Sequence, residues 1–242
     1  MQMYDHVLAI DPNHANTICH YGLVLQAEGQ NLTKSVEYFD RAVEVDPLHA
    51  PSLGFKGMIL HTAFKNLTGA EECYQKALKI TPTDPIVLSN YAQLHQARNN
   101  LGAAESLLKL SLKHDPSHVA TLSAYAQLQN ERRDYEGATE LYVRAYKSDP
   151  HNVVTLIDHA LLLATRMKKF EEALEILRRA QARDRSGDTD SDVQQAIAHV
   201  KQLKVSLVKS TMKKNQIGAK NRWSNYYCRR TRSCRRLGGG LE

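Results

Sequence analysis

Histidine is the residue type in this sequence with the widest chemical range. The chain has 242 residues and 11 histidines, and four of these, His14, His49, His118 and His151, follow shortly after a proline. A metal site needs several ligands that converge on one point, whereas these side chains are spread one to a loop. We therefore expect them to be polar surface residues and not metal ligands.

Two further histidines, His95 and His159, fall within segments of helical periodicity. A helical metal site needs a second ligand one turn away. His159 has Thr155 four residues before it and Leu163 four residues after it, and neither is a strong ligand. We expect both histidines to pack against neighbours or face solvent.

Paired carboxylates are the other candidates for catalysis. Glu71-Glu72 and Glu171-Glu172 have the residue type needed for acid–base chemistry. However, both pairs stand where a helix is predicted to begin, and negative charge there complements the helix dipole. The sequence also lacks the phosphate-loop, dinucleotide-binding, zinc-protease and nucleophilic-serine motifs. We expect no catalytic, cofactor-binding or metal-binding residues, so the chain is predicted not to be an enzyme.

The four cysteines, Cys19, Cys73, Cys228 and Cys234, form no Cys-x-x-Cys pair that would indicate zinc. The N-terminal residues lack the pattern of a signal peptide, and no stretch approaches the roughly 20 apolar residues of a membrane span. We therefore expect free thiols in a reducing compartment, the cytoplasm or alternatively the nucleus, and no membrane partner.

A repeat of 34 or 35 residues organises the elements that carry these side chains. Its clearest marker is a proline, at Pro12, Pro47, Pro82, Pro116 and Pro150. An apolar residue follows six positions later, a small residue ten later and an aliphatic residue twelve later. In the third repeat these are Leu88, Ala92 and Leu94. Such spacings place all three on one face of a helix.

A second helix is predicted before each closing proline. A small residue stands twelve positions before the proline and a bulky one eight before, as Ala70 and Tyr74 do in front of Pro82. Small residues let two helices approach closely, and proline ends the second helix because it lacks an amide hydrogen. One helix pair cannot bury its apolar face alone, so we expect the pairs to stack.

The pattern resembles the tetratricopeptide repeat family over roughly residues 1–185. Leu122-Ser-Ala-Tyr-Ala-Gln-Leu and Asp134-Tyr-Glu-Gly-Ala match that repeat in order and spacing, although Ile or Leu replaces the family's frequent Trp. The resemblance implies an all-α fold, a right-handed superhelical solenoid of antiparallel helix pairs.

We divide the chain into four segments. Residues 1–12 hold the second helix of an incomplete repeat, which suggests a fragment of a longer array, and residues 13–185 hold five helix pairs. Residues 186–212 are predicted to form a capping helix with an apolar stripe. Residues 213–242 contain nine Lys and Arg and one acid and are predicted to be a disordered basic tail.

The resemblance also implies that the first helix of each pair lines a concave groove that binds an extended protein segment. Amide side chains in the groove could hydrogen-bond a ligand backbone, and Phe55 and Met58 could form an apolar pocket. The alternative is a solvated polar face. The candidate groove residues are His20, Phe55, Met58, Ser89, Asn90, Gln93, Ser123, Gln127, Asn130 and Asp158.

These candidates are nearly uncharged, which disfavours the capture of a chaperone's C-terminal carboxylate that some family members perform with a clamp of cations. We expect a protein–protein interaction scaffold or adaptor. One alternative is the docking portion of a larger enzyme, for example a glycosyltransferase. A third is RNA association through the tail, where Trp223 and Tyr226 lie among basic residues. The tail could also be a nuclear-import patch or have no role.

Overall fold

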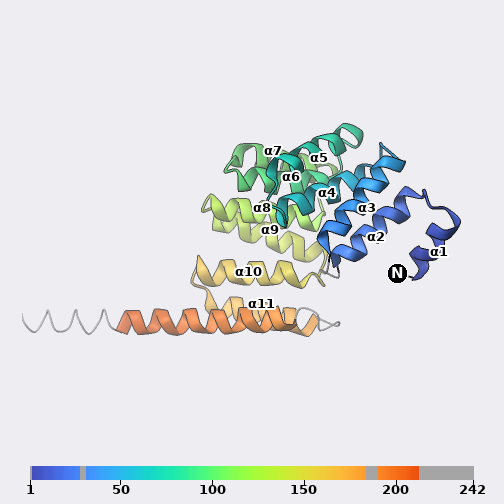
Figure 1. Ribbon diagram of the computed structural model, residues 1–242. Helices are drawn as coiled ribbons and strands as arrows, with labels where there is room; N and C mark the ends of the chain where they lie inside the picture. Colours follow the sequence, from blue (N-terminus) through green and yellow to red (C-terminus); the bar gives the residue numbers. More distant parts are fainter. Residues whose placement is uncertain (1, 28–30, 184–189, 213–242) are drawn as a thin grey trace, which may run out of the picture. The chain divides into compact units, whose positions relative to one another are not determined.

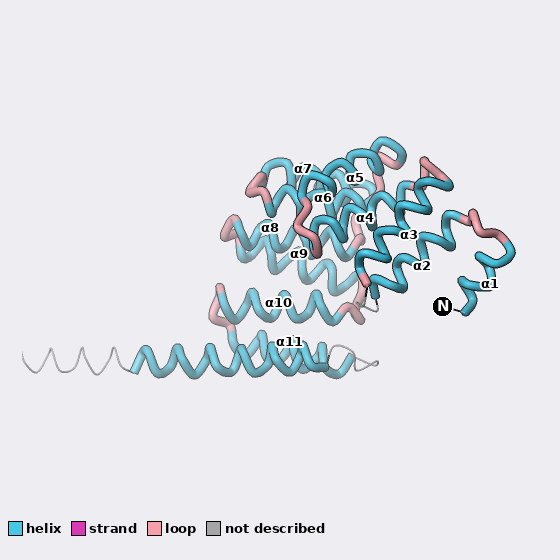
Figure 2. The backbone as a smooth tube through the Cα atoms, viewed as in Figure 1, coloured by secondary structure: helices cyan, strands magenta, loops and turns pink. Residues whose placement is uncertain are grey.

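A computed structural model describes residues 2–27, 31–183 and 190–212 of the protein. In these ranges every regular element is an α-helix, as predicted (Figure 2). The labelled helices are α1 (Gln2–Ile10), α2 (Ala15–Ala27), α3 (Leu32–Val45), α4 (Ala50–Thr62), α5 (Leu67–Ile80), α6 (Pro85–Ala97), α7 (Leu101–His114), α8 (Val119–Glu131), α9 (Tyr135–Ser148), α10 (Val153–Thr165) and α11 (Phe170–Arg183). One more helix, over residues 190–212, is called the terminal helix below.

The chain forms two compact units, Met1–Thr155 and Leu156–Glu242, each with its own contacts. In the first unit α2 packs against α3, α4 against α5, α6 against α7 and α8 against α9, as antiparallel pairs (Figure 1). The second helices α3, α5 and α7 also pack against α4, α6 and α8 of the next pair, and α2, α4, α6 and α8 contact one another in turn. The predicted pairing of consecutive helices is therefore confirmed.

Close approach within a pair depends on the small residue of the first helix. A Cβ atom on Gly57 would lie 2.8 Å from Cε1 of Tyr74, and one on Gly22 would lie 2.8 Å from Cε1 of Phe39. Both aromatic rings are fully buried. The ring of the second helix thus occupies the space that a side chain on the first helix would take.

Polar side chains begin the helices and prolines follow their ends. Asn31, Asn66, Asn100 and Asp134 cap the second helices of the first unit by accepting a hydrogen bond from a backbone amide in the first turn. These helices end two residues before each predicted proline, and the C-cap residue in between has non-helical backbone, which a following proline favours.

The second unit has a small core of its own. Ala160 and Leu163 of α10 pack with Ala173 and Leu177 of α11 and with Val200 of the terminal helix. The terminal helix lies within the segment predicted to be a cap, 186–212. The predicted basic tail, residues 213–242, and residues 184–189 lie outside the described residues. None of the described helices is long and apolar enough to cross a membrane.

Candidate functional site

The predicted groove residues divide between the two units. Nine of the ten lie on α2, α4, α6 and α8 of the first unit, and we call the side of these helices that carries them the first-helix face. Asp158 lies on α10 in the second unit and is not part of this face. Because α2, α4, α6 and α8 contact one another in sequence, side chains on them can form continuous rows.

The two predicted serines are engaged in structural contacts. Ser89 is only 1% exposed, and its Oγ donates to the backbone oxygen of Ile86 at 3.0 Å. The Oγ of Ser123 lies 3.1 Å from Oγ1 of Thr155. Ser89 is therefore not available to a ligand, because its side chain is buried and already hydrogen-bonded to the backbone of its own helix.

The predicted apolar pair also contributes to packing. The ring of Phe55 is half-buried and stacks on Phe39, with 5.9 Å between the centroids. It belongs to the edge of the cluster that Ile18 and Ile59 fill. Met58 is half-buried as well. These two side chains present only part of their surface, so they form less of a pocket than the sequence alone indicates.

The amide side chains are the more accessible part of the face. Asn90, Gln93 and Asn130 are half-buried, and Gln127 is exposed. Their neutral donors and acceptors can pair with the backbone of a second chain. They lie on two neighbouring helices, α6 and α8, so a ligand crossing this part of the face would meet them together.

Three amide side chains occupy the same position in their repeats, and this set was not predicted from the sequence. Gln26, Gln96 and Asn130 each stand 14 residues after a repeat proline, and His61 takes this position in the second repeat. The three amide oxygens are buried, and none of the described residues donates a hydrogen bond to them. We call Gln26, His61, Gln96 and Asn130 the amide row.

An unpaired buried acceptor costs about 1–3 kcal/mol, so three at equivalent positions are unusual. Burial lowers the pKa of His61, and the nearby Lys65 lowers it further. The row is therefore neutral throughout, with oxygen or nitrogen acceptors on consecutive first helices. The signal that could have revealed it is the common distance from the prolines.

At the other end of the face, His20 is exposed and in contact with two neighbours. Its Nδ1 lies 2.6 Å from the backbone oxygen of Asn16, and its ring stacks on Tyr4 of α1 with 6.3 Å between centroids. Asn16 in turn accepts a hydrogen bond at 2.9 Å from Nε2 of His49. This chain of contacts fixes the position of His20 beside α1.

The prediction that the loop histidines are surface residues is wrong for His49, which is 8% exposed. Nδ1 of His49 accepts from the backbone amide of Ser52 at 3.3 Å, which makes it the N-cap of α4. His14 accepts from the amide of Thr17 in the same way at 3.2 Å. The loop slot after the proline is a helix cap, and this explains its polar residues.

Glu71, which was predicted to complement a helix dipole, also links two neighbouring repeats. Oε2 of Glu71 accepts from Nη1 of Arg98 at 2.5 Å, and its Oε1 accepts from the hydroxyl of Tyr91 at 3.2 Å. The hydrogen bond from Arg98 is the main reason why the pKa of Glu71 is lowered. A carboxylate held ionised by these partners is unsuited to proton transfer near neutral pH.

The same arrangement recurs 34 residues later. Arg132 donates to Glu105 at 2.6 Å and Tyr125 donates to it at 3.1 Å. Hydrogen bonds from Lys109 and Arg132 lower the pKa of Glu105 to about 2. We call these two sets, Glu71–Tyr91–Arg98 and Glu105–Tyr125–Arg132, the repeat joints.

The remaining candidates for chemistry lie on four different helices. The ring of His95 lies 4.6 Å from that of Tyr91, and His159 is 7% exposed, with burial lowering its pKa to about 4. Cys19 and Cys73 are buried free thiols. In the described part of the chain, no three His, Cys, Asp or Glu side chains are grouped to hold a metal ion.

Comparisons with known proteins agree with this geometry. Two family models, each described as tetratricopeptide repeat, match residues 23–85 and 61–129. No protein with a curated description matches the chain significantly.

Three solved structures illustrate the likeness in fold. A tetratricopeptide repeat protein of Thermus thermophilus superposes with a TM-score of 0.69 at 16% identity, covering 77% of this chain and 98% of that one. Yeast Tom70 gives 0.65 at 21% identity over 84% of this chain, which spans only 42% of Tom70. PilW, a type IV pilus biogenesis factor, gives 0.62 at 18% identity, over 81% of this chain and 87% of that one.

Proposed function

The chain belongs to the tetratricopeptide repeat family, and we propose that it is a protein-binding scaffold which holds an extended partner segment along its first-helix face. The function is binding without catalysis: among the described residues, Glu71 and Glu105 are held in the repeat joints, and His14 and His49 cap helices. Repeat proteins of this family generally mediate protein–protein interaction.

The observation that carries the proposal is the amide row. Neighbouring packed helices lie about 8–10 Å apart, and an extended chain rises about 3.3 Å per residue. A ligand crossing the helices would therefore bring every third residue past one member of the row. Its backbone N–H groups would supply the donors that Gln26, Gln96 and Asn130 lack once the half-buried amides turn outward.

The neutral character of the face specifies the ligand further. Cations are absent from the predicted groove positions of the first unit, so a C-terminal carboxylate would find no charge-assisted bonds there. The face would recognise the ligand's backbone N–H groups and contact its side chains through the exposed edges of Phe55 and Met58. This suits a neutral segment with small apolar side chains.

The test replaces the three amides together, Gln26→Ala, Gln96→Ala and Asn130→Ala. Partners are first captured on the full chain and identified by mass spectrometry, and the affinity of one purified partner is then measured by calorimetry. We expect binding to fall at least about tenfold, which is 1.4 kcal/mol. Stability should stay the same or rise, because removing an unpaired buried acceptor removes its cost.

The matched control replaces three exposed polar residues on second helices, Thr33→Ala, Thr68→Ala and Ser106→Ala. It should leave binding unchanged. A second triple variant, Asn90→Ala, Gln93→Ala and Gln127→Ala, examines the accessible amides predicted from the sequence. If both first-helix variants fold and bind as the native chain does, the first-helix face is not the binding site.

A further inference from the structure

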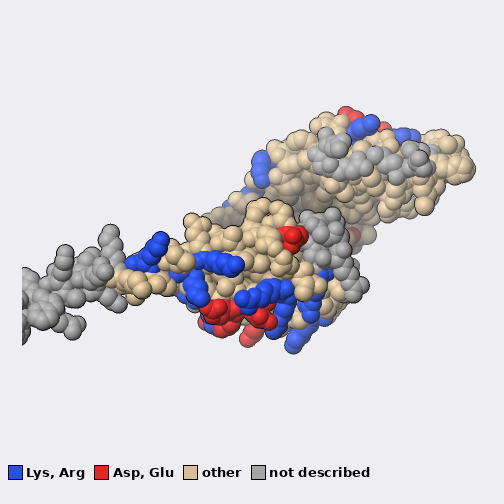
Figure 3. Space-filling view, turned by 90° about the horizontal axis from the view of Figure 1, so that it is seen from below, with Lys and Arg blue, Asp and Glu red and all other residues tan. Residues whose placement is uncertain are grey.

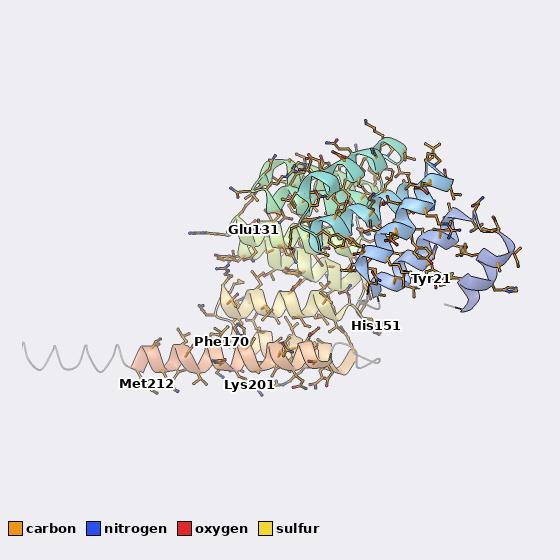
Figure 4. The ribbon with its side chains drawn as sticks, in the orientation of Figure 1. Tyr21, Glu131, His151, Phe170, Lys201 and Met212 are labelled. Atoms are coloured by element: carbon orange, nitrogen blue, oxygen red, sulfur yellow. The ribbon has the colours of Figure 1, made fainter. Side chains whose placement is uncertain are left out.

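The terminal helix is longer than the helix it covers. Gln181 near the end of α11 donates a hydrogen bond to Asp190 at one end of the contact, and Lys204 pairs with Glu171 at the other. Residues 205–212 continue past the start of α11, a length of about 12 Å at 1.5 Å per residue. Figure 4 shows the terminal helix running from Lys201 past Phe170 to Met212.

This extension leaves apolar side chains uncovered. Val205 is 52% exposed and Val208 46%, and Met212 is exposed as well. Because Val205, Val208 and Met212 are three and four residues apart, they form one stripe on the helix. Singly exposed apolar residues are ordinary, but a stripe rimmed by charges marks an interaction surface.

An open groove of about 670 Å³ lies along this stripe. Its walls come from two helices of the same unit, each contributing residues at helical spacing over about two turns. We call it the terminal groove; it is lined by Glu171, Leu174, Arg178, Lys201, Lys204, Val205, Val208 and Lys209. Leu174 forms part of its apolar floor, since it is only 8% exposed and belongs to the core.

The rim of the groove carries unbalanced positive charge. It has four cations and one acid, Glu171, which is already paired with Lys204. Arg178 faces Glu175 at 3.6 Å, whereas Lys201 and Lys209 form no ion pair with a described residue. Figure 3 shows Lys and Arg gathered along the terminal helix on the face in view. An occupant would gain most from acidic groups opposite Lys201 and Lys209.

We propose that the terminal groove binds an amphipathic acidic helix of a partner protein. A helix lying between two helices can place anchors at i, i+3, i+4 and i+7 on Val205, Val208 and Leu174. Glutamates beside that stripe would then face Lys201 and Lys209. Because the groove lies between two helices of one unit, a third helix can pack along it. The site lies in the second unit and does not depend on the first-helix face.

The probe is a labelled synthetic peptide of about 20 residues, long enough to form a helix, with leucines at i, i+3, i+4 and i+7 and glutamates beside them. A second peptide carries lysines in place of the glutamates. Fluorescence anisotropy with the full chain should show micromolar binding of the acidic peptide and at least about tenfold weaker binding of the basic one.

Two double variants locate the site. The variant Lys201→Glu with Lys209→Glu should bind the acidic peptide at least about tenfold more weakly than the native chain does. The variant Val205→Ser with Val208→Ser should bind it about fivefold more weakly, or weaker still. The matched control, Lys113→Glu with Lys147→Glu, makes the same charge change on exposed lysines of the first unit and should have less than about a threefold effect. All these positions are exposed, and circular dichroism checks that each variant keeps its helices.

Three results would overturn the proposal. In one, the acidic peptide binds the Lys201 and Lys209 variant as tightly as the native chain. In another, neither peptide binds. In the third, phosphatidylserine vesicles or a DNA duplex bind in a manner that depends on Lys201 and Lys209 while the acidic peptide does not, which would assign the basic rim to a membrane or a nucleic acid.

Discussion

At the scale of single residues, histidine is used in this protein as a helix cap. Nδ1 of His118 lies 2.7 Å from the hydroxyl of Thr121, and His14 and His49 accept a hydrogen bond through Nδ1 from the backbone amide three residues later. Asp84 and Asn152 do the same in the corresponding slots of other repeats. Only neutral imidazole has a ring nitrogen that accepts, so the cap made by the buried His49 requires an uncharged ring.

The neutral rings make folding stability depend on pH. Burial lowers the pKa of His49, His61, His95, His118 and His159 in the folded chain. The unfolded chain takes up protons near pH 6.5, whereas the folded chain takes them up only at lower pH. The free energy of unfolding therefore falls as the pH falls below about 6.5 and levels off only below the folded pKa values.

Replacing one of these histidines with asparagine should reduce this dependence. His118→Asn should change the free energy of unfolding by less than about 1 kcal/mol at pH 7.5, because asparagine caps well. The loss of stability between pH 7.5 and pH 5 should be smaller than in the native chain. Urea denaturation at both pH values measures this, with the exposed His199→Asn as the control. Equal losses in the variant and the native chain would contradict a lowered pKa of His118.

Only some contacts of single residues could be predicted from the sequence. Two contacts form only because α1, α2 and α4 pack in three dimensions: one between Tyr4 and His20, the other between Asn16 and His49. No local sequence pattern encodes such pairs. Ser89 appeared accessible because its slot faces outward in a regular helix, yet its neighbours cover it. The polar slot after each proline could have been identified as a cap, since Asp84 is a common capping residue.

At the scale of helices, each pair is fitted by a complementary small and large residue. Gly57 faces Tyr74, whereas in the next repeat Ala92 stands at the glycine's slot and Leu108 at the tyrosine's. In that repeat the smaller leucine leaves room for a methyl group on the first helix, whereas Ala126 and Tyr142 of the fourth repeat combine a methyl group with a tyrosine. The two positions should therefore be energetically coupled.

A double-mutant cycle measures this coupling. Gly57→Ala in the native background should destabilise by about 1–3 kcal/mol, because its Cβ would overpack the buried ring of Tyr74. In the Tyr74→Leu background the same change should be neutral or stabilising by up to about 1 kcal/mol, since alanine is the better helix former. Denaturant unfolding of the four proteins gives the coupling energy. Equal effects in both backgrounds would show that the ring yields without cost.

The positions of the helices in the sequence were predicted best, and the reason is physical. Proline, small and aliphatic slots recur in every pair because each pair must bury the same stripe against its neighbours. The predicted capping segment, residues 186–212, contains the terminal helix, which is described over residues 190–212. Its extension beyond α11 was not foreseen, because residues 205–212 continue the apolar stripe whether or not another helix covers it.

At the scale of the whole molecule, stability should vary along the chain. In a repeat array each helix pair is held by its neighbours. The central helices α6 and α8 contact helices before and after them, whereas α1 packs mainly on α2 and residues 205–212 are exposed throughout. Opening of the less covered segments needs fewer contacts to break.

Hydrogen exchange followed by mass spectrometry tests this expectation. Backbone amides of α1 and of residues 205–212 should exchange at least about tenfold faster than those of α6 and α8 at neutral pH. Addition of the acidic helical peptide should slow exchange in residues 205–212 and leave α1 unchanged. Uniform exchange rates along the described helices would indicate that the array opens only as one cooperative whole.

The repeat joints also bear on how an array of this kind can lengthen. Residues 85–118 contain Tyr91 and Arg98, which meet the preceding Glu71, and Glu105, which meets the following Tyr125 and Arg132. A tandem duplication of this block would set its own Glu105 against a copied Tyr91 and Arg98, reproducing a contact that already exists. The genetic unit that duplicates and the physical unit that docks are then the same 34 residues, so a longer protein requires no newly evolved interface.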